Sequence, residues 1–321
     1  RFPVVFFSLK NVDGLIFADA KYRLTELVAA EAERFLFLSD SKKLSENEKN
    51  RYQALIALDH GRYTMDETIL VSSLQLLSQL LYRHYGQKTI ILIDEYDVPL
   101  QSAYQNNYYD EMVDFLRSVF SSALKTNDAL EKGIMTGCLR ISKESIFTGL
   151  NNFTSYSLLN NGGSEYFGFN EKEVKQLLKD YDLFDSFDEV KEWYDGYLFG
   201  NLEIYNPWST LSYVKNKKAD SSFEPISFWA NTSGNELVVN YIQTGDRGLR
   251  KEFELLMNGQ TIDKVIKPEL TYREMDNINN IYSFLLLTGY LKVIEKTGDR
   301  QYKLIIPNRE VYEIYKQSFM S

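Results

Sequence analysis

Two adjacent acidic residues, Asp94 and Glu95, directly follow the apolar run Thr89–Ile93. A run of this length and composition predicts a strand buried on both faces, whose carboxyl end presents both carboxylates at the edge of a sheet. One carboxylate there can hold Mg²⁺ through a water molecule, while its neighbour orients and deprotonates the water that attacks a triphosphate. A buried strand that ends in two solvated acids gives the same pattern, so both interpretations are open at this point.

A magnesium–triphosphate site also needs a loop that cradles the phosphates, of the form G-x-x-x-x-G-K-[ST]. The sequence does not contain this motif, because no glycine pair is followed by the required lysine. Gly133 and Gly137 lead into Cys138, and Gly162–Gly163 leads into Ser164. We therefore expect that residues 1–321 alone do not bind ATP tightly or hydrolyse it by this mechanism.

Apolar runs that predict strands alternate with amphipathic stretches that predict helices. The predicted strands are Val4–Leu9, Thr89–Ile93, Gly133–Cys138 and Thr154–Leu159, and the predicted helices between them are Leu15–Phe37, Met65–Tyr85 and Asp110–Leu124. This alternation predicts βα units and a mostly parallel sheet. Ligands bind at the carboxyl ends of such strands, where Asp94, Glu95 and Arg140 would fall.

Beyond Glu165 the sequence changes in character. Helical stretches surround a predicted hairpin at Gly200–Tyr205, and the chain later combines a helix from about Ile278 with the predicted strands Tyr290–Ile294 and Tyr302–Ile306. A helix followed by a two-stranded ribbon is typical of a winged-helix module. The capping signals in the chain are Ser45 with Glu48, Asn170 with Glu173, Gly86 at a helix end and Pro207 in a first turn.

Composition limits the class of protein. Apolar residues make up 44% of the chain, which allows a sizeable core, and the net charge of −9 argues against a general nucleic-acid coat. The single Cys138 excludes an intrachain disulfide framework and favours a cytoplasmic setting. No apolar run reaches the roughly 20 residues that span a bilayer, so we expect no membrane partner. The chain starts at Arg1 without Met, so we expect a piece of a longer protein.

Several sequence blocks resemble the bacterial AAA-ATPase-like family, related to STAND-type and archaeal-type P-loop ATPases. The blocks that carry the resemblance are Ile91–Leu100, Thr136–Phe147, Gly149–Asn152, Tyr166–Phe169, Trp193–Tyr197, Tyr205–Ser209 and Trp229–Ser233. The resemblance implies an ATPase that uses Mg²⁺ and ATP, with a phosphate loop just before the strand at Val4–Leu9. It also implies that a PD-(D/E)xK nuclease-like domain often follows the region present here.

The fold implied by the resemblance is an α/β, three-layer P-loop core that lacks its first strand. We place this partial core at residues 1–164, an all-α lid at 165–265 and a winged-helix-like module at 266–321. The absent strand would be central and leave a slot between the strand ending at Cys138 and the one at Thr154–Leu159. Exposed strand edges there would promote aggregation of residues 1–321 alone.

The resemblance assigns roles to single residues. Asp94 would be the metal-proximal acid, Glu95 the water-activating acid, Thr136 a nucleotide-site residue and Arg140 a sensor of the γ-phosphate. Arg140 as a structural ion pair is an equal alternative. Asp97 would belong to the nucleotide site or fix the turn after the strand. Arg117 would act as an arginine finger in a homo-oligomer, or be an ordinary charge on a helix surface.

Three functions follow from these features. The first is a nucleotide-driven switch, the second a degenerate, non-catalytic interaction scaffold, and the third a DNA-targeting module for an appended nuclease. The third would use ribbon cations such as Lys292, Lys296, Arg300 and Lys303. The aromatic blocks Tyr166–Phe169 and Trp193–Tyr197 could stack on bases, but their acidic neighbours favour packing between the lid and the core. For Trp208 we expect helix entry with a buried indole.

Overall fold

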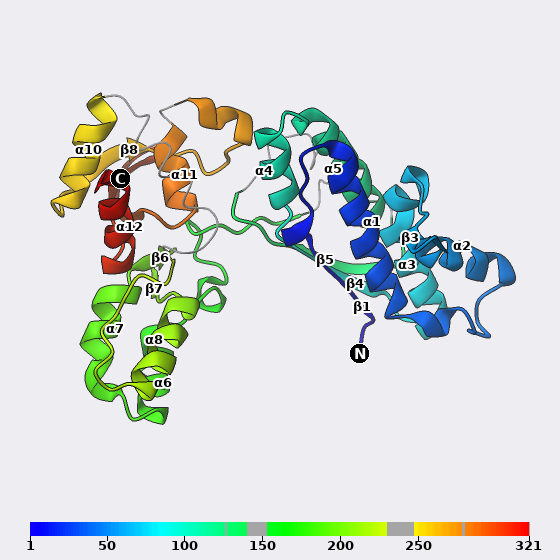
Figure 1. Ribbon diagram of the computed structural model, residues 1–321, viewed down its shortest axis with the longest axis horizontal. Coiled ribbons are helices and arrows are strands. Elements are labelled where there is room, and N and C mark those ends of the chain that lie inside the picture. Colours follow the sequence, from blue (N-terminus) through cyan, green and yellow to red (C-terminus); the bar gives the residue numbers. More distant parts are fainter. Residues whose placement is uncertain (126, 140–152, 230–246, 278–279, 321) are drawn as a thin grey trace. The chain divides into compact units, whose positions relative to one another are not determined.

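The computed structural model describes residues 1–125, 127–139, 153–229, 247–277 and 280–320. The chain forms two compact units: residues 1–153 with 269–273, and residues 154–268 with 274–321 (Figure 1). Arg140 lies outside the described residues. The predicted division into three domains stays a prediction.

The first unit contains a three-stranded parallel sheet in the order β1-β4-β5, which confirms the predicted α/β class. Its strands are β1 (Val4–Ser8), β4 (Thr89–Asp94) and β5 (Leu130–Met135). Its helices are α1 (Phe17–Glu33), α2 (Glu46–Ile56), α3 (Glu67–Tyr85), α4 (Val98–Gln105) and α5 (Tyr109–Leu124), and a short hairpin joins β2 (Leu58–Asp59) to β3 (Arg62–Tyr63).

Local sequence signals set the helix ends as expected. Ser45 and Glu48 form a capping box that opens α2. Asp66 accepts a hydrogen bond from the Ile69 amide at the start of α3, and Gly86 ends that helix with a φ of 69°. A glycine adopts this left-handed conformation without the steric cost of a Cβ atom.

Helices cover only one face of the sheet (Figure 1). On that face Phe7 and Ile93 pack with side chains of α1, α3 and α5 around one small internal void. The predicted third layer is wrong for the described residues. The strands follow one another in a single direction across the sheet, and right-handed crossovers then place their helices on the same side.

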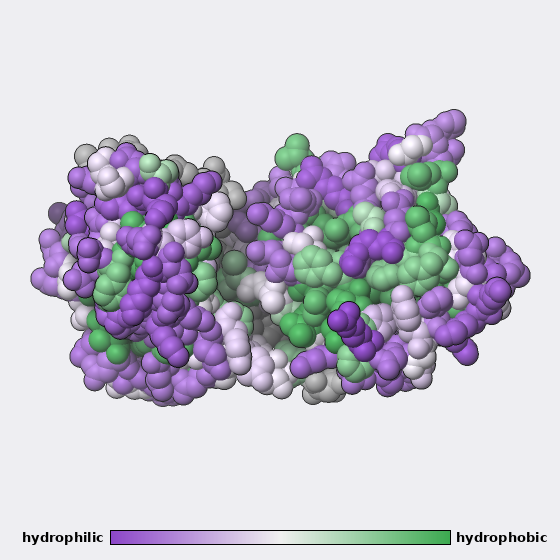
Figure 2. All heavy atoms as spheres, turned by 90° about the horizontal axis from the view of Figure 1, so that it is seen from below, coloured by the Kyte–Doolittle hydropathy of each residue, from purple (hydrophilic) through white to green (hydrophobic). Residues whose placement is uncertain are grey.

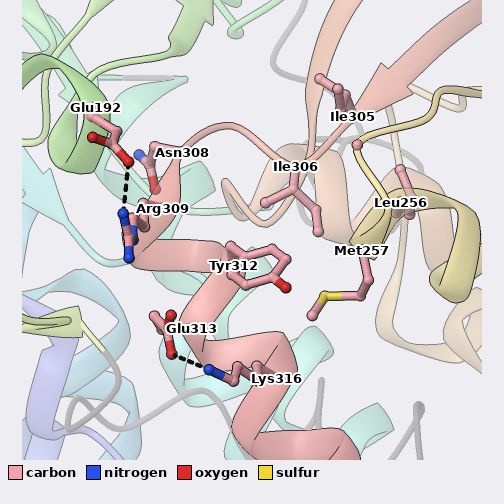
Figure 3. Close-up of a pocket in the computed structure, with 11 residues that line it drawn as sticks. Glu192, Leu256, Met257, Ile305, Ile306, Asn308, Arg309, Tyr312, Glu313 and Lys316 are labelled. Carbon is pink, nitrogen blue, oxygen red and sulfur yellow. Dashed lines mark hydrogen bonds and ion pairs between the residues drawn. The ribbon is translucent and has the colours of Figure 1, made fainter.

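The opposite face of the sheet carries exposed apolar side chains. Val4, Phe6 and Ile134 are 37%, 45% and 44% exposed, and Leu92 between them in register is half-buried. Figure 2, which views the molecule from below, shows apolar side chains gathered on this side of the first unit. We call the face defined by Val4, Phe6, Leu92 and Ile134 the open face.

The two edges of this sheet differ. At β1 the outward amide of Phe6 donates a 2.8 Å hydrogen bond to the buried carboxylate of Glu31 on α1. At β5, residues 131–134 are exposed, and no described strand pairs with the outer side. Among the described residues, a side chain thus occupies an outward amide of β1, whereas no strand covers the outer side of β5.

The predicted fourth strand at Thr154–Leu159 is wrong. This segment forms no strand and belongs to the second unit, where the Leu158 carbonyl accepts a hydrogen bond of 2.7 Å from the Gly200 amide. Its short apolar pattern does not select a partner, and a strand needs a neighbouring strand to satisfy its backbone groups. The predicted third strand is confirmed, but it begins and ends three residues earlier than expected.

The second unit combines helices with a small antiparallel sheet of order β8-β10-β9. Its helices are α6 (Glu171–Asp180), α7 (Phe187–Tyr194), α8 (Pro207–Ala219), α10 (Arg247–Met257), α11 (Ile281–Leu287) and α12 (Arg309–Met320). Its strands are β6 (Tyr197–Phe199), β7 (Leu202–Ile204), β8 (Ile262–Val265), β9 (Lys292–Gly298) and β10 (Gln301–Ile305). The predicted ribbon is thus confirmed as β9–β10, whereas β8 and α12 were not anticipated.

The aromatic blocks are divided between core and surface. Tyr194, Tyr205 and Tyr213 form a buried cluster with apolar residues of α6, α7 and α8 inside the second unit, so the predicted packing between lid and core stays a prediction. The prediction of a buried indole at Trp208 is wrong, because this side chain is 64% exposed. Asn206 caps α8 and leaves Trp208, the second residue of the helix, on its outer side. Tyr166 is also exposed, so packing does not account for every aromatic residue.

A buried carboxylate connects several segments of the second unit. One Glu310 oxygen accepts hydrogen bonds from the Ser209 hydroxyl at 2.8 Å and from the amides of Phe228 and Trp229 at 2.9 and 3.0 Å. The side chain is fully buried, and its second oxygen has no hydrogen-bond partner among the described residues. Burial raises the pKa of Glu310 because the charged form loses its hydration.

A candidate magnesium and nucleotide site at the strand ends

Three polar side chains lie in a row where β1, β4 and β5 end. Ser8 is in register with Asp94, and its hydroxyl lies 3.4 Å from one Asp94 oxygen. The Thr136 hydroxyl donates to the other Asp94 oxygen. Alternation along the strands puts this row on the same side of the sheet as the open face. The structure therefore brings together Asp94 and Thr136, as the sequence predicts, and adds Ser8.

Glu95 sits in an unusual backbone conformation directly after this row. Its φ is 56°, in the left-handed region that costs a non-glycine residue on the order of 1 kcal/mol. Burial and the charge of Asp94 raise the pKa of Glu95, while Lys10, just beyond β1, partly offsets both effects. A carboxylate whose affinity for a proton is increased in this way is suited to accept one from water.

Asp97 fixes the turn that carries Glu95. Its carboxylate is buried and accepts hydrogen bonds from the amides of Cys138 and Leu139, at 3.2 and 2.9 Å. Burial raises the pKa of Asp97 to about 6. A Cβ atom on Gly137 would lie 2.5 Å from the Asp97 carboxylate, so this close approach requires glycine. These contacts favour the turn-fixing interpretation of Asp97 over direct contact with a nucleotide.

Arg117 gives no sign of belonging to the site. It lies on α5 and forms an ion pair of 2.8 Å with Asp114, one helical turn away. This geometry is that of an ordinary helix-surface pair. Its predicted trans-acting role and the predicted homo-oligomer stay predictions.

Sequence reasoning missed Ser8 and Lys10. Ser8 lies near the end of the predicted strand Val4–Leu9, and Lys10 follows that strand. A comparison of all strand ends would therefore have identified them as neighbours of Asp94 and Glu95. The missing information was the strand order, which places β1 directly beside β4.

The row can supply part of a metal site. Carboxylate and hydroxyl oxygens suit Mg²⁺, which keeps several waters and relies on substrate phosphates for further ligands. Within the described ranges, no group of three or more His, Cys, Asp or Glu side chains could hold a metal by itself. Asp94 with its hydroxyl neighbours thus fits a Mg²⁺ ion that arrives with a phosphate ligand.

Comparison with known proteins finds similarities that include the first unit. Residues 1–147 match the family model AAA-ATPase-like, described as a predicted AAA-ATPase. The AAA-ATPase-like match covers β1, β4, β5 and every residue of the polar row. An uncharacterized protein in the vnfD 5′ region of Azotobacter chroococcum mcd 1 is 27% identical over 231 residues, which is 70% of this chain. The chain spans only 42% of the length of that relative.

Proposed function

We propose that this chain carries the metal- and water-binding half of a Mg²⁺-dependent ATPase site and works as a nucleotide-driven switch. Asp94 would hold Mg²⁺ through water, Glu95 would activate the attacking water, and Thr136 with Ser8 would orient Asp94. The observation that carries the proposal is the row formed by Ser8, Asp94 and Thr136 at the carboxyl edge of the parallel sheet. The AAA-ATPase-like match to residues 1–147 supports it.

The open face supports a site completed by another segment. In the described ranges no strand pairs with the outer edge of β5, and the open face beside it is apolar. A strand–loop–helix segment paired with β5 would cover this face and bring a phosphate-binding loop to the same end of the sheet as Asp94. Such a segment, encoded elsewhere in the intact protein, is part of the proposal, as is any appended nuclease domain.

The second unit supports a structural wing better than a DNA reader. The order α10, β8, α11 and then the β9–β10 ribbon supports the proposal of a winged-helix-like module. However, six of the seven residues of α11 are buried, so this helix has little surface for a DNA groove. In the ribbon, Lys303 pairs with Glu295 at 3.0 Å, and Lys296 lies over the Tyr302 ring.

In the described part of the chain, every helix is too short or too polar to cross a lipid bilayer.

Asp94→Asn tests the proposed metal role in the intact protein. The neutral amide binds the hydrated ion less well, so the Mg²⁺ concentration needed for half-maximal ATP hydrolysis should rise by roughly 10- to 100-fold. A titration of activity with Mg²⁺ at saturating ATP measures this. Asp128→Asn, at an exposed acid away from the row, is the control and should behave as the parent. An unchanged Mg²⁺ requirement in Asp94→Asn would remove the basis of the proposal.

The double variant Phe6→Lys, Ile134→Lys tests whether the open face causes self-association of residues 1–321 alone. Removing two exposed apolar side chains and adding charge should weaken self-association about tenfold, which corresponds to roughly 1.4 kcal/mol. Sedimentation velocity over a concentration series measures the change. Leu15→Lys replaces a side chain that is 79% exposed but lies off the sheet, and should change little. A parent chain that stays monomeric over the whole concentration series contradicts the prediction.

A further inference from the structure

A short segment from late in the sequence is part of the first unit. Glu269–Arg273 groups with residues 1–153, although β8 before it and α11 after it belong to the second unit. Leu270, Thr271 and Tyr272 are buried in succession. Leu270 and Thr271 precede a short 3-10 helix that begins at Tyr272, and three consecutive buried residues there indicate a segment held by specific contacts. We call Glu269–Arg273 the strap.

Aromatic and ionic contacts attach the strap to α4 and α5. The Tyr272 ring stacks on Tyr104 of α4 with centroids 6.1 Å apart, and meets Tyr109 of α5 edge-on at 6.4 Å. The Arg273 guanidinium lies 5.3 Å from the centre of the Tyr109 ring and forms an ion pair with Asp110. The strap thus holds the end of α4 against the start of α5.

The strap is linked through α4 to the turn that follows Glu95. Burial and then the charge of Asp97 raise the pKa of Tyr272 well above its ordinary value. Asp97 is the residue immediately before α4 and holds the amides of Cys138 and Leu139. Tyr272 therefore contacts α4 directly at Tyr104, and Asp97 lies immediately before that same helix.

We propose that Tyr272 and Arg273 are positioning residues, through which the second half of the chain sets the orientation of the turn that carries Glu95. They contact α4 and α5 and leave the reacting groups untouched. Because the strap is continuous with β8 and α11, a change in the second unit can tighten or release it. The consequence for catalysis rests on the proposed ATPase function, whereas the positioning itself does not.

Hydrogen exchange of the complete chain without nucleotide tests the strap. In Tyr272→Ala the amides of Cys138 and Leu139 and those of α4 should exchange about tenfold faster or more, since the contacts that keep them closed are weakened. The amides of β9, β10 and α12 should keep their parent rates. Tyr181→Ala, at a half-exposed tyrosine after α6 in the second unit, is the matched control and should leave α4 unchanged.

A second variant and a second readout keep the test decisive. Arg273→Ala removes a half-exposed side chain, should fold even if Tyr272→Ala does not, and should accelerate the same amides by a smaller factor. The carboxyl carbon of Asp97, followed by NMR, should titrate near 6 in the parent and at lower pH in Tyr272→Ala, because losing the ring lets water reach the carboxylate. A contact that only stabilises the core would not move this titration.

Two results would overturn the proposal. Unchanged exchange at Cys138, Leu139 and α4 in both variants would show that the strap does not hold the turn. Equal acceleration throughout both units would show that Tyr272 is a general core residue. Because no nucleotide is present, these outcomes are independent of whether Asp94 and Glu95 perform ATP hydrolysis.

Discussion

Glu95→Gln in the intact protein should leave ATP bound and lower kcat by about 10²- to 10⁴-fold, the contribution typical of a general base. The amide keeps the size of the side chain and its ability to orient water, but it cannot accept a proton. Asp94 keeps its hydrogen bond from Thr136, so Mg²⁺·ATP should bind as in the parent. Single-turnover hydrolysis together with equilibrium binding of a fluorescent ATP analogue separates the two effects.

Glu165→Gln is a suitable control for this experiment. Glu165 is exposed and lies in the second unit, so the same change of charge there should leave kcat unaffected. Turnover in Glu95→Gln within a factor of two of the parent would exclude Glu95 as the water-activating acid. Loss of ATP binding together with turnover would point instead to damage of the strained turn at this residue.

Glu310→Ala should destabilise the second unit by about 3 kcal/mol or more. The substitution leaves the Ser209 hydroxyl and the Phe228 and Trp229 amides without their acceptor, and a buried group without a partner costs about 1–3 kcal/mol. Urea unfolding followed by the fluorescence of Trp208 and Trp229 measures the change. Glu313→Ala, one turn further along α12 at a half-exposed site, is the control and should cost much less.

Glu310→Gln separates the charge of this residue from its hydrogen bonds. Burial raises the pKa of Glu310 above its ordinary 4.5, so the folded state holds its proton more tightly than the unfolded chain does. The parent should therefore lose stability as the pH rises from about 4.5 through the higher pKa of the folded state. Glutamine cannot ionise, so the unfolding free energy of Glu310→Gln relative to the parent should increase over this interval. A difference that is constant with pH would contradict this account.

Patterns local to the sequence predicted most elements of the first unit. The strands at Val4–Leu9 and Thr89–Ile93 and the caps at Ser45 and Gly86 depend on neighbours within a few residues, and the structure has them where expected. Burial on both faces is wrong for the first strand, where Val4 and Phe6 are exposed. The rule that parallel strands end at one edge placed Asp94 and Glu95 there, whereas Thr136 was assigned to the site only by the resemblance.

Features that depend on distant parts of the chain were missed. Whether Thr154–Leu159 is a strand depends on having a strand to pair with, and its hydrogen bond goes to Gly200 instead. The strap could not be anticipated because Leu270–Tyr272 has no periodic pattern and its partners, such as Tyr104, lie more than 150 residues earlier. Trp208 was misplaced because the cap at Asn206 fixes where α8 begins, but not which side of that helix faces the core.

The carboxylate of Glu31 at the outer amide of Phe6 has a consequence for how copies of this chain associate. A sheet with two unpaired edges can add further molecules at both edges and grow into fibrils. A sheet with one blocked edge can add molecules on one side only. Two copies that pair through β5 would cover the β5 edge of each copy and form a dimer. Association of residues 1–321 through their backbone should therefore end at discrete dimers, and Glu31→Ala should open the route to longer polymers.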